Sequence, residues 1–375
     1  MADNKDKKVL NVPALRFPEF NGEWITQPIK DIADFIGGGT PSSANEAYWQ
    51  GTIPWVSSSD IAEDNINDIT ISRYITEEAI SNSATKLCSA PVILIVSRVG
   101  VGKVALSNKA ICTSQDFCNL INIKVHPTFL AYSLSQIMKR KSMEVQGTSI
   151  KGITSSEIQK IILRIPSLQE QHKISNLFQL IDKRIATQNK IIEKLETLIK
   201  GIVETVISSQ KPNTLIKNCL ECNLSTLQES QVAKTGTFPV YGATGISGYT
   251  ETADINGESI LIIKDGSGVG TVKFVTGKYS YIGTLNSLTV KDGYCLKYIY
   301  FALQRLSFEP YKTGMAIPHI YFKDYGKAKI FCPTIKEQFA IAKRISSIED
   351  KVSVEKRILF YYQAQKSYLL SQMLI

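Results

Sequence analysis

The chain has 375 residues, of which 43% are hydrophobic and 21% are charged, and this is enough apolar material for two sizeable cores. No apolar run reaches the length needed to span a membrane, and the polar, lysine-bearing start does not resemble a secretory signal. The formal net charge of +9 favours a polyanionic partner such as nucleic acid, although solubility alone would also explain it.

Seven cysteines are scattered along the chain. Cys219 and Cys222 form one CxxC pair, but a structural zinc site needs four ligands, and no second pair or nearby histidine pair completes it. The pair also lacks the strand-to-helix setting of a redox motif. We therefore expect reduced structural thiols in a cytoplasmic protein.

Residues 1–166 predict a globular domain with mixed strands and helices. Runs rich in isoleucine and valine at 92–97 and 120–125 are typical of strands, and a helix is expected at 127–140. The composition of 37–43 and 57–60 predicts loops, whose side chains can bond phosphates or base edges. Any single one could equally be a solvated loop residue, so the set carries the prediction. The candidate DNA contacts of this domain are Thr40, Ser42, Trp55, Ser57, Ser58, Arg98, Lys103, Thr148 and Lys151.

A long helix is expected at residues 167–208. A strand-like run at 160–165 stops at Pro166, Ser167 can cap the helix, and Glu170 stands where a capping-box partner belongs. Apolar residues then recur mostly at alternating steps of three and four, the spacing of a coiled-coil seam. This series consists of Leu177, Ile181, Ile185, Gln188, Ile192, Leu195, Ile199, Ile202 and Val206.

Residues 209–333 predict a second mixed domain. Strands are expected at 259–263, 272–276 and 287–290, a helix at 295–306, and loops at 235–250 and 265–270. Its candidate DNA contacts are Tyr241, Thr244, Tyr249, Lys264, Lys273, Lys312 and His319.

A second long helix is expected at 334–375. A strand-like run at 327–332 precedes Pro333, and Thr334 with Glu337 can form the same capping box. The seam of this helix consists of Ile341, Ile345, Ile348, Val352, Glu355, Leu359, Tyr362, Lys366, Leu369 and Met373.

The two halves repeat one another at a shift of 167 residues. Segments 147–171 and 314–338 align without a gap, and both end in Pro-[ST]-[LI]-x-Glu-Gln. The helix seams keep the same register, and even their polar step is shared, Gln188 falling on Glu355. We assign the shared positions to helix spacing and partner docking: Glu170, Gln171, Ile181, Gln188, Glu337, Gln338, Ile348 and Glu355.

These patterns predict an α+β fold in which two mixed α/β domains alternate with two long helices. Each helix of roughly 40 residues would measure about 60 Å, too long to bury its stripe against a small domain. The economical arrangement is an antiparallel pair with the stripes facing, which would relate the halves by a pseudo-twofold axis.

Motifs for catalysis are weak. The glycine-rich run 266–270 lacks the Gly-Lys-[ST] ending of a nucleotide-binding loop. The Glu-Asp-Lys at 349–351 matches the Glu-x-Lys part of a magnesium-dependent nuclease motif, but it lies beside the helix seam, where we expect solvated side chains. No methyltransferase motif is found, and His126, His172 and His319 follow no ligand spacing.

Several segments together resemble the specificity (S, HsdS) subunit of type I restriction-modification systems. They are LRFPEFNGEW at 15–24, GGTPS at 38–42, IPWVSSSD at 53–60, FPVYG at 238–242, ISGY at 246–249, and Pro-x-x-x-Glu-Gln at 166–171 and 333–338. The doubled Pro-x-x-x-Glu-Gln ahead of a long helix is the most specific, and the resemblance spans the chain from about residue 13 to its end.

The resemblance implies that residues 1–166 and 209–333 are target recognition domains, each reading one part of a split, asymmetric sequence in double-stranded DNA. It implies that the helices at 167–208 and 334–375 pair antiparallel as a spacer and dock modification (M) subunits, expected to number two. The M subunits would bind S-adenosylmethionine, and restriction (R) subunits would use ATP and magnesium. This chain would be non-catalytic and would bind no cofactor or metal.

Two other functions fit parts of the sequence. A coiled-coil scaffold with two protein-binding heads would explain the repeat, and salt-sensitive DNA binding separates it from a DNA reader. A single-chain enzyme with an unfamiliar site would show methyl transfer or cleavage without partners.

Overall fold

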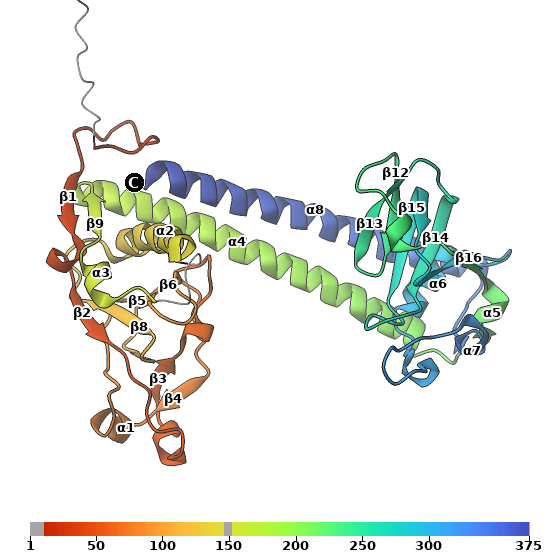
Figure 1. Cartoon of the computed structure of the whole chain (residues 1–375), viewed down its shortest axis with the longest axis horizontal. Coiled ribbons are helices and arrows are strands. Elements are labelled where there is room, and N and C mark those ends of the chain that lie inside the picture. The colour runs from red at the N-terminus through yellow and green to blue at the C-terminus, as the bar shows by residue number, and fades with distance from the viewer. Residues whose placement is uncertain (1–10, 146–151, 375) are drawn as a thin grey trace, which may run out of the picture. The chain divides into compact units, whose positions relative to one another are not determined.

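The computed structural model describes residues 11–145 and 152–374, which form two compact units (Figure 1). Unit 1 comprises the chain up to residue 188 together with residues from 358 onward, and unit 2 comprises residues 189–357. The two long helices, α4 (Leu168–Val203) and α8 (Ile335–Met373), therefore each contribute one part to both units.

Unit 1 is built on three small sheets. The largest has the antiparallel order β2-β8-β5-β6, and β4-β3-β7 and β1-β9 form the other two. The strands are β1 (Ile25–Pro28), β2 (Asp34–Gly37), β3 (Ile53–Val56), β4 (Arg73–Ile75), β5 (Val92–Val96), β6 (Val104–Ser107), β7 (Cys112–Thr113), β8 (Phe117–Ile121) and β9 (Ile162–Ile165). The helices, besides α4, are α1 (Glu77–Ser81), α2 (Pro127–Val145), α3 (Ser155–Gln159) and the 3-10 turns Ile29–Asp31, Glu46–Trp49 and Ser58–Asp60.

Strand β5 lies at the centre of unit 1, and every one of its residues is buried. Ile93 and Ile95 face a core shared with α2 and the first turns of α4, whereas Val92, Leu94 and Val96 face a second core under β3. Burial on both faces explains why its sequence is a continuous apolar run without the polar alternation of a surface strand.

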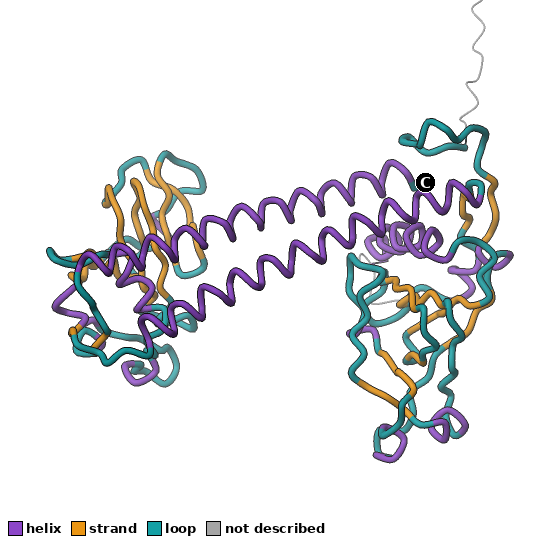
Figure 2. Tube along the Cα trace, turned by 180° about the vertical axis from the view of Figure 1, so that it is seen from behind, coloured by secondary structure: helices purple, strands orange, loops and turns teal. Residues whose placement is uncertain are grey.

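Unit 2 contains one six-stranded sheet of order β11-β16-β14-β15-β12-β13, drawn together in orange in Figure 2. Only the β12–β15 pair is parallel. The strands are β10 (Thr214–Leu215), β11 (Leu220–Leu224), β12 (Phe238–Gly242), β13 (Gly245–Thr250), β14 (Ile255–Ile263), β15 (Val272–Tyr281), β16 (Leu285–Val290) and β17 (Lys329–Ile330), which pairs with β10. The helices, besides α8, are α5 (Ile216–Cys219), α6 (Leu296–Leu303), α7 (Phe322–Tyr325), the π-turn Glu204–Ser208 and the 3-10 turns Glu229–Gln231 and Glu309–Tyr311. Helix α6 packs on β14 and β15.

Three expectations about local structure are wrong. The predicted loop 235–250 is the hairpin β12-β13, whose glycine, serine and threonine content hid its strands; its turn depends on Gly245, at φ +133°. The predicted strand 120–125 is β8, which ends at residue 121 because Asn122 adopts φ +50°. The predicted strand 327–332 shrinks to the two residues of β17.

The predicted helix seams are confirmed. Every residue of both series is buried or half-buried. In unit 1, Ile174, Phe178 and Ile181 of α4 share a core with Leu370 and Met373 of α8. The ion pair between Asp182 and Lys366 extends this contact in the antiparallel direction. In unit 2 an ion pair joins Glu196 of α4 to Lys356 of α8, which also fits antiparallel helices.

The Gln of each Pro-x-x-x-Glu-Gln segment is buried and makes the same bonds in both copies. In unit 1, Gln171 accepts a bond from the backbone N–H of His126 at 2.8 Å and donates to the carbonyl of Pro166 at 2.8 Å. In unit 2, Gln338 accepts from the backbone N–H of Cys295 at 3.0 Å and donates to the carbonyl of Pro333 at 2.8 Å. The repeat therefore preserves a joint between the long helix and the start of α2 or α6.

Each copy forms only one half of the predicted capping box. The carboxylate of Glu337 accepts bonds from the backbone N–H and the hydroxyl of Thr334 at 3.0 and 2.7 Å. In the first copy the hydroxyl of Ser167 accepts from the N–H of Glu170, but the Glu170 carboxylate is buried and accepts two bonds from Arg16, both at 2.8 Å. Glu170 thus anchors the N-terminal segment to α4.

All seven cysteines are free, and all except the half-buried Cys222 are buried. Burial raises the pKa of Cys88 to about 11 and that of Cys112 to about 12, so these thiols stay protonated at neutral pH. Within residues 11–145 and 152–374, no helix is long and apolar enough to cross a membrane, and no three His, Cys, Asp or Glu side chains gather as metal ligands.

Candidate nucleic-acid interface

Trp55 is a core residue and not a surface contact, contrary to the sequence-based expectation. It lies on β3 with only 3% of its surface exposed, and its indole N–H donates to the carbonyl of Gly39 at 2.9 Å. Trp49 packs edge-on against it, with the ring centroids 5.1 Å apart. One face of the Trp55 ring instead supports a neighbouring cation, Arg73, whose guanidinium carbon lies 4.5 Å from the ring centroid.

The predicted residues Ser57, Ser58 and Lys103 lie together at the end of β3. Asp60 accepts bonds from the backbone N–H and the hydroxyl of Ser57 at 2.7 and 2.9 Å, which fixes the turn. The ammonium of Lys103 donates to the carbonyl of Ser58 at 3.4 Å. Arg73, which sequence analysis missed, donates to both Ser57 and Asp60. This cluster combines two cations with hydroxyl groups on a partly exposed turn.

The charge state of Asp60 is set by these contacts. Its burial would raise the pKa, but hydrogen bonds from Ser57 and Arg73 together with the Arg73 charge outweigh burial and hold the pKa below its ordinary value. Asp60 is therefore a carboxylate at neutral pH and can orient the guanidinium.

The other predicted residues of unit 1 lie apart from this cluster or outside the described residues. Thr40 and Ser42 are exposed on the loop after β2, where the Thr40 hydroxyl bonds the side chain of Gln115. Arg98 is exposed just after β5. Thr148 and Lys151 fall outside the described residues.

In unit 2 the structure brings Lys264, Lys312 and His319 onto two loops that are bonded to each other. The carbonyl of Lys264 accepts from the N–H of Ile320 at 2.9 Å, and the N–H of Gly266 donates to the carbonyl of Pro318 at 2.9 Å. His319 pairs with Thr313 through both backbone groups, which closes the second loop. The loops 264–270 and 312–320 thus form one surface, on which Lys264 and Lys312 are paired with the neighbouring carboxylates of Asp265 and Glu309.

The tip of the second loop carries exposed apolar side chains that sequence analysis missed. Met315 is fully exposed, and Ile317 is also largely exposed. Exposed apolar groups beside cations are typical of loops that contact bases or wedge between them. Only the run Met-Ala-Ile-Pro between Gly314 and His319 could have indicated this tip, because apolar residues in a short loop have no core to join.

Tyr241 and Lys273 are a second pair that the structure unites. The Lys273 ammonium lies 4.8 Å from the centroid of the Tyr241 ring, which in turn packs edge-on against Tyr279. Tyr249 lies on β13 and exchanges backbone bonds with Ala233, while Thr244 is exposed in the hairpin turn.

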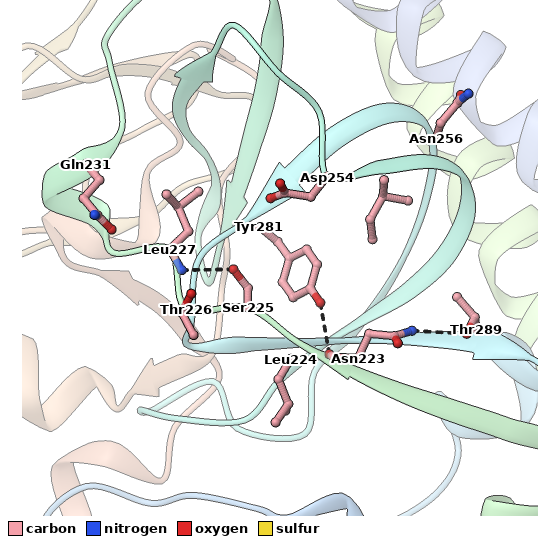
Figure 3. Close-up of a pocket in the computed structure, with 11 residues that line it drawn as sticks. Asn223, Leu224, Ser225, Thr226, Leu227, Gln231, Asp254, Asn256, Tyr281 and Thr289 are labelled. Atoms are coloured by element: carbon pink, nitrogen blue, oxygen red, sulfur yellow. Dashed lines mark hydrogen bonds between the residues drawn. The ribbon is translucent and has the colours of Figure 1, made fainter.

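A hollow of about 780 Å³ opens where β11, β14, β15 and β16 meet (Figure 3). The Tyr281 hydroxyl donates to the carbonyl of Asn223 at 3.0 Å, and the Asn223 amide donates to the hydroxyl of Thr289 at 3.2 Å. Among the residues that the structure describes, no lysine or arginine lines the hollow, but the carboxylate Asp254 does. It therefore does not suit a phosphate backbone, and none of the predicted contacts that the structure describes lies in it.

The residues predicted to dock partners lie mostly inside the molecule. Gln171, Ile181 and Gln338 are buried, and Ile348 and Glu355 are half-buried. Ile181, Ile348 and Glu355 lie in the seam, where each faces the other helix, and Gln171 and Gln338 are engaged in the joint with α2 and α6, so none of them is open to a partner. Glu170 and Gln188 are buried too, whereas Glu337 is exposed. The large apolar side chains of the two long helices that do face outward are Leu168, Leu180, Phe360, Tyr361 and Tyr368 in unit 1, and Ile191, Leu198, Ile335, Phe339 and Val354 in unit 2.

Comparison with known proteins gives one family. The model of the type I restriction modification DNA specificity domain matches residues 21–197 and again residues 220–359. The two matches cover both predicted domains and most of both long helices, which supports the internal repeat.

Individual relatives agree with this family. The chain is 32% identical over 46% of its length to the type I restriction enzyme MjaIX specificity subunit of Methanocaldococcus jannaschii, and 29% identical over 48% to the EcoR124I/EcoR124II specificity subunit of Escherichia coli. The alignments cover 42% and 45% of these relatives, so the chain spans less than half of either. A crystal structure of the S subunit of a type I system from M. genitalium shares the fold, with a TM-score of 0.67 at 17% identity over 97% of this chain and 99% of that one.

Proposed function

Since the chain belongs to the family of type I restriction modification DNA specificity domains, we propose that it reads a bipartite, asymmetric DNA target for a restriction-modification complex. The observation that carries this proposal is the contrast between what is repeated and what is not. The joint built on Gln171 and Gln338 is the same in both units, whereas the cation-bearing loops around Ser57 and His319 differ. Two different sets of loops on one repeated scaffold suit a DNA target whose two halves differ in sequence.

Each unit offers the groups that DNA recognition needs. In unit 1 these are the hydroxyls and cations at the end of β3, and in unit 2 the bonded loops 264–270 and 312–320 with their apolar tip. Lysine can hold phosphates and so fix the register of each unit on the duplex, while arginine, serine and threonine can read base edges. We therefore assign base reading to these loops and positioning to their lysines.

The long helices are the proposed dock for modification subunits. Because the seam residues pack against the other helix, we assign docking to the residues that face outward. Among these, Phe360, Tyr361 and Tyr368 are large, apolar and exposed. Exposed apolar groups of this size mark interaction surfaces. With one M subunit docked on each unit, the chain would bind two M subunits, and restriction subunits would complete the complex.

In this proposal the chain is non-catalytic. It recognises the target DNA sequence, whereas the M subunits bind S-adenosylmethionine and methylate adenine, and the R subunits use ATP and magnesium. The scaffold alternative is weaker because a protein-binding head has no need of the cations that gather on the loops of both units.

The test is a methylome of cells that express this chain with its cognate M subunit. We expect methylated adenines in one motif with two defined parts separated by unspecified bases. Cells with the M subunit alone are the control and should lack that motif. A continuous motif, or methylation that does not depend on this chain, would contradict the proposal. In binding assays with the M complex, affinity should fall steeply with salt, because phosphate contacts release counterions.

A further inference from the structure

Arg73 is held in a single orientation by three neighbours at the edge of a sheet in unit 1. It begins β4, the edge strand of the sheet β4-β3-β7, directly opposite Trp55 in the antiparallel register. Its guanidinium stacks on the Trp55 ring with 4.5 Å between the guanidinium carbon and the centroid. The side chain nevertheless keeps 39% of its surface exposed. It is thus neither a buried structural arginine nor a free surface one.

The hydrogen bonds of Arg73 use only one of its three nitrogens. Nη2 donates to the hydroxyl of Ser57 at 2.7 Å and to the carboxylate of Asp60. Asp60 is itself fixed by the N–H and hydroxyl of Ser57, so the support is rigid. Among the described residues, Nε and Nη1 donate to none. Nη1 therefore offers two N–H donors whose direction is already set.

This arrangement suits base reading better than phosphate binding. A phosphate contact needs charge, and the adjoining Asp60 carboxylate reduces the net charge of the pair. Reading a base edge needs a donor of fixed direction more than it needs charge, and a planar group stacked on an aromatic ring loses little freedom on binding. Guanine presents two acceptors in the major groove, O6 and N7, and arginine is their usual partner.

We propose that Arg73 reads a guanine in the part of the target that unit 1 recognises, by donating from Nη1 to the acceptors of its major-groove edge. Trp55, Ser57 and Asp60 are positioning residues that hold the guanidinium. Lys103, bonded to the carbonyl of Ser58 on the same turn, lies where it can contact the phosphate backbone. This inference rests on the proposed function and assigns one residue of that site its base.

The experiment compares methylomes of the chain with its M subunit for wild type, Arg73→Ala and Arg73→Gln. The wild type is expected to require a guanine at one position of one half of the motif. Both variants should accept other bases there, with the preference for guanine falling about tenfold or more. The other positions of the same half should stay required, which shows that unit 1 of each variant is folded, and the half of the motif that unit 2 reads should stay unchanged. Arg164→Ala, an exposed arginine on β9 of the same unit, is the matched control and should leave the motif intact.

A second measurement tests the atoms. In a duplex carrying the wild-type motif, 7-deazaguanine at the assigned position removes N7, and binding by the wild-type complex should weaken while binding by the Arg73→Ala complex should not change further. Methylation that falls at all sites with an unchanged motif would make Arg73 a phosphate contact and overturn the proposal. An unchanged motif at an unchanged rate would make it a structural pair and overturn it as well. Failure of the wild type to produce a bipartite motif would instead overturn the proposed function itself.

Discussion

Replacing Lys366 with methionine should destabilise unit 1 far more than an equivalent change in unit 2. Lys366 of α8 and Asp182 of α4 are only 7% and 6% exposed, and they form an ion pair in the helix seam. Lys366 also donates to the carbonyl of Asp64 at 2.8 Å. The pair therefore links both helices to the recognition domain of this unit.

The size of the effect follows from what remains after the substitution. Asp182 would stay buried with two neutral donors, the hydroxyl of Tyr132 at 2.6 Å and the amide of Asn67 at 3.2 Å. Removing one partner of a buried pair costs about 3–5 kcal/mol, because the other charge loses its compensation. Since two donors remain, we expect about 3 kcal/mol. For a unit of this size each kcal/mol corresponds to about 2–4 °C, so the transition of unit 1 should fall by about 6–12 °C.

The chain contains its own control. Lys356 and Glu196 form the same kind of pair between α8 and α4 in unit 2, but their side chains are 56% and 43% exposed. Lys356→Met should cost less than about 1 kcal/mol. Hydrogen exchange of the amides in each unit, read by mass spectrometry, reports the two costs separately. Equal costs for the two variants, or a cost near zero for Lys366→Met, would refute the reasoning.

Three further predictions concern the joint, the turn and the loop tip. Gln171→Ala and Gln338→Ala each leave a buried N–H and a carbonyl unpaired, so each should cost about 1–3 kcal/mol in its own unit by hydrogen exchange, and an effect confined to one copy would contradict a duplicated joint. Because the folded protein lowers the pKa of Asp60, the carboxylate contributes its full stability at pH values above its ordinary pKa of 3.8. This stability is lost as the pH falls through the lower pKa of the folded state. Thermal melts across pH should show this acid dependence in the wild type and not in Asp60→Asn. Met315→Ser should weaken DNA binding without changing its salt dependence, whereas Lys264→Ala should lower the salt slope by about one, and a reversal of the two would place the loop tip away from DNA.

The helix seams could be predicted because they are long and periodic. A pattern repeated over about forty residues, in two copies with the same register, leaves little room for error. The pairing of Gln171 and Gln338 was visible as a repeat, but its cause was not, since buried backbone partners such as the N–H of His126 leave no trace in the sequence.

The recognition surface was harder to predict because its residues are single and context-dependent. Trp55 stands two residues before Ser57 in the same motif, and only the fold shows that it faces the core. Arg73 lies between a serine and a tyrosine with no spacing to mark it, and its orientation comes from residues 13 to 18 positions earlier in the chain. The apolar tip at Met315 is marked in the sequence only by a short Met-Ala-Ile-Pro run, and only the fold shows that this run is exposed.

The joint between helix and domain has one further consequence. Gln171 and Gln338 reach only main-chain atoms: the N–H groups of His126 and Cys295 and the carbonyls of Pro166 and Pro333. A bond to the main chain is indifferent to which side chain stands there, and a histidine and a cysteine already occupy the same role. A substitution of His126 or Cys295 by any residue other than proline would therefore leave the joint intact, so each domain can diverge in sequence at its attachment point while its attachment to the helix stays the same.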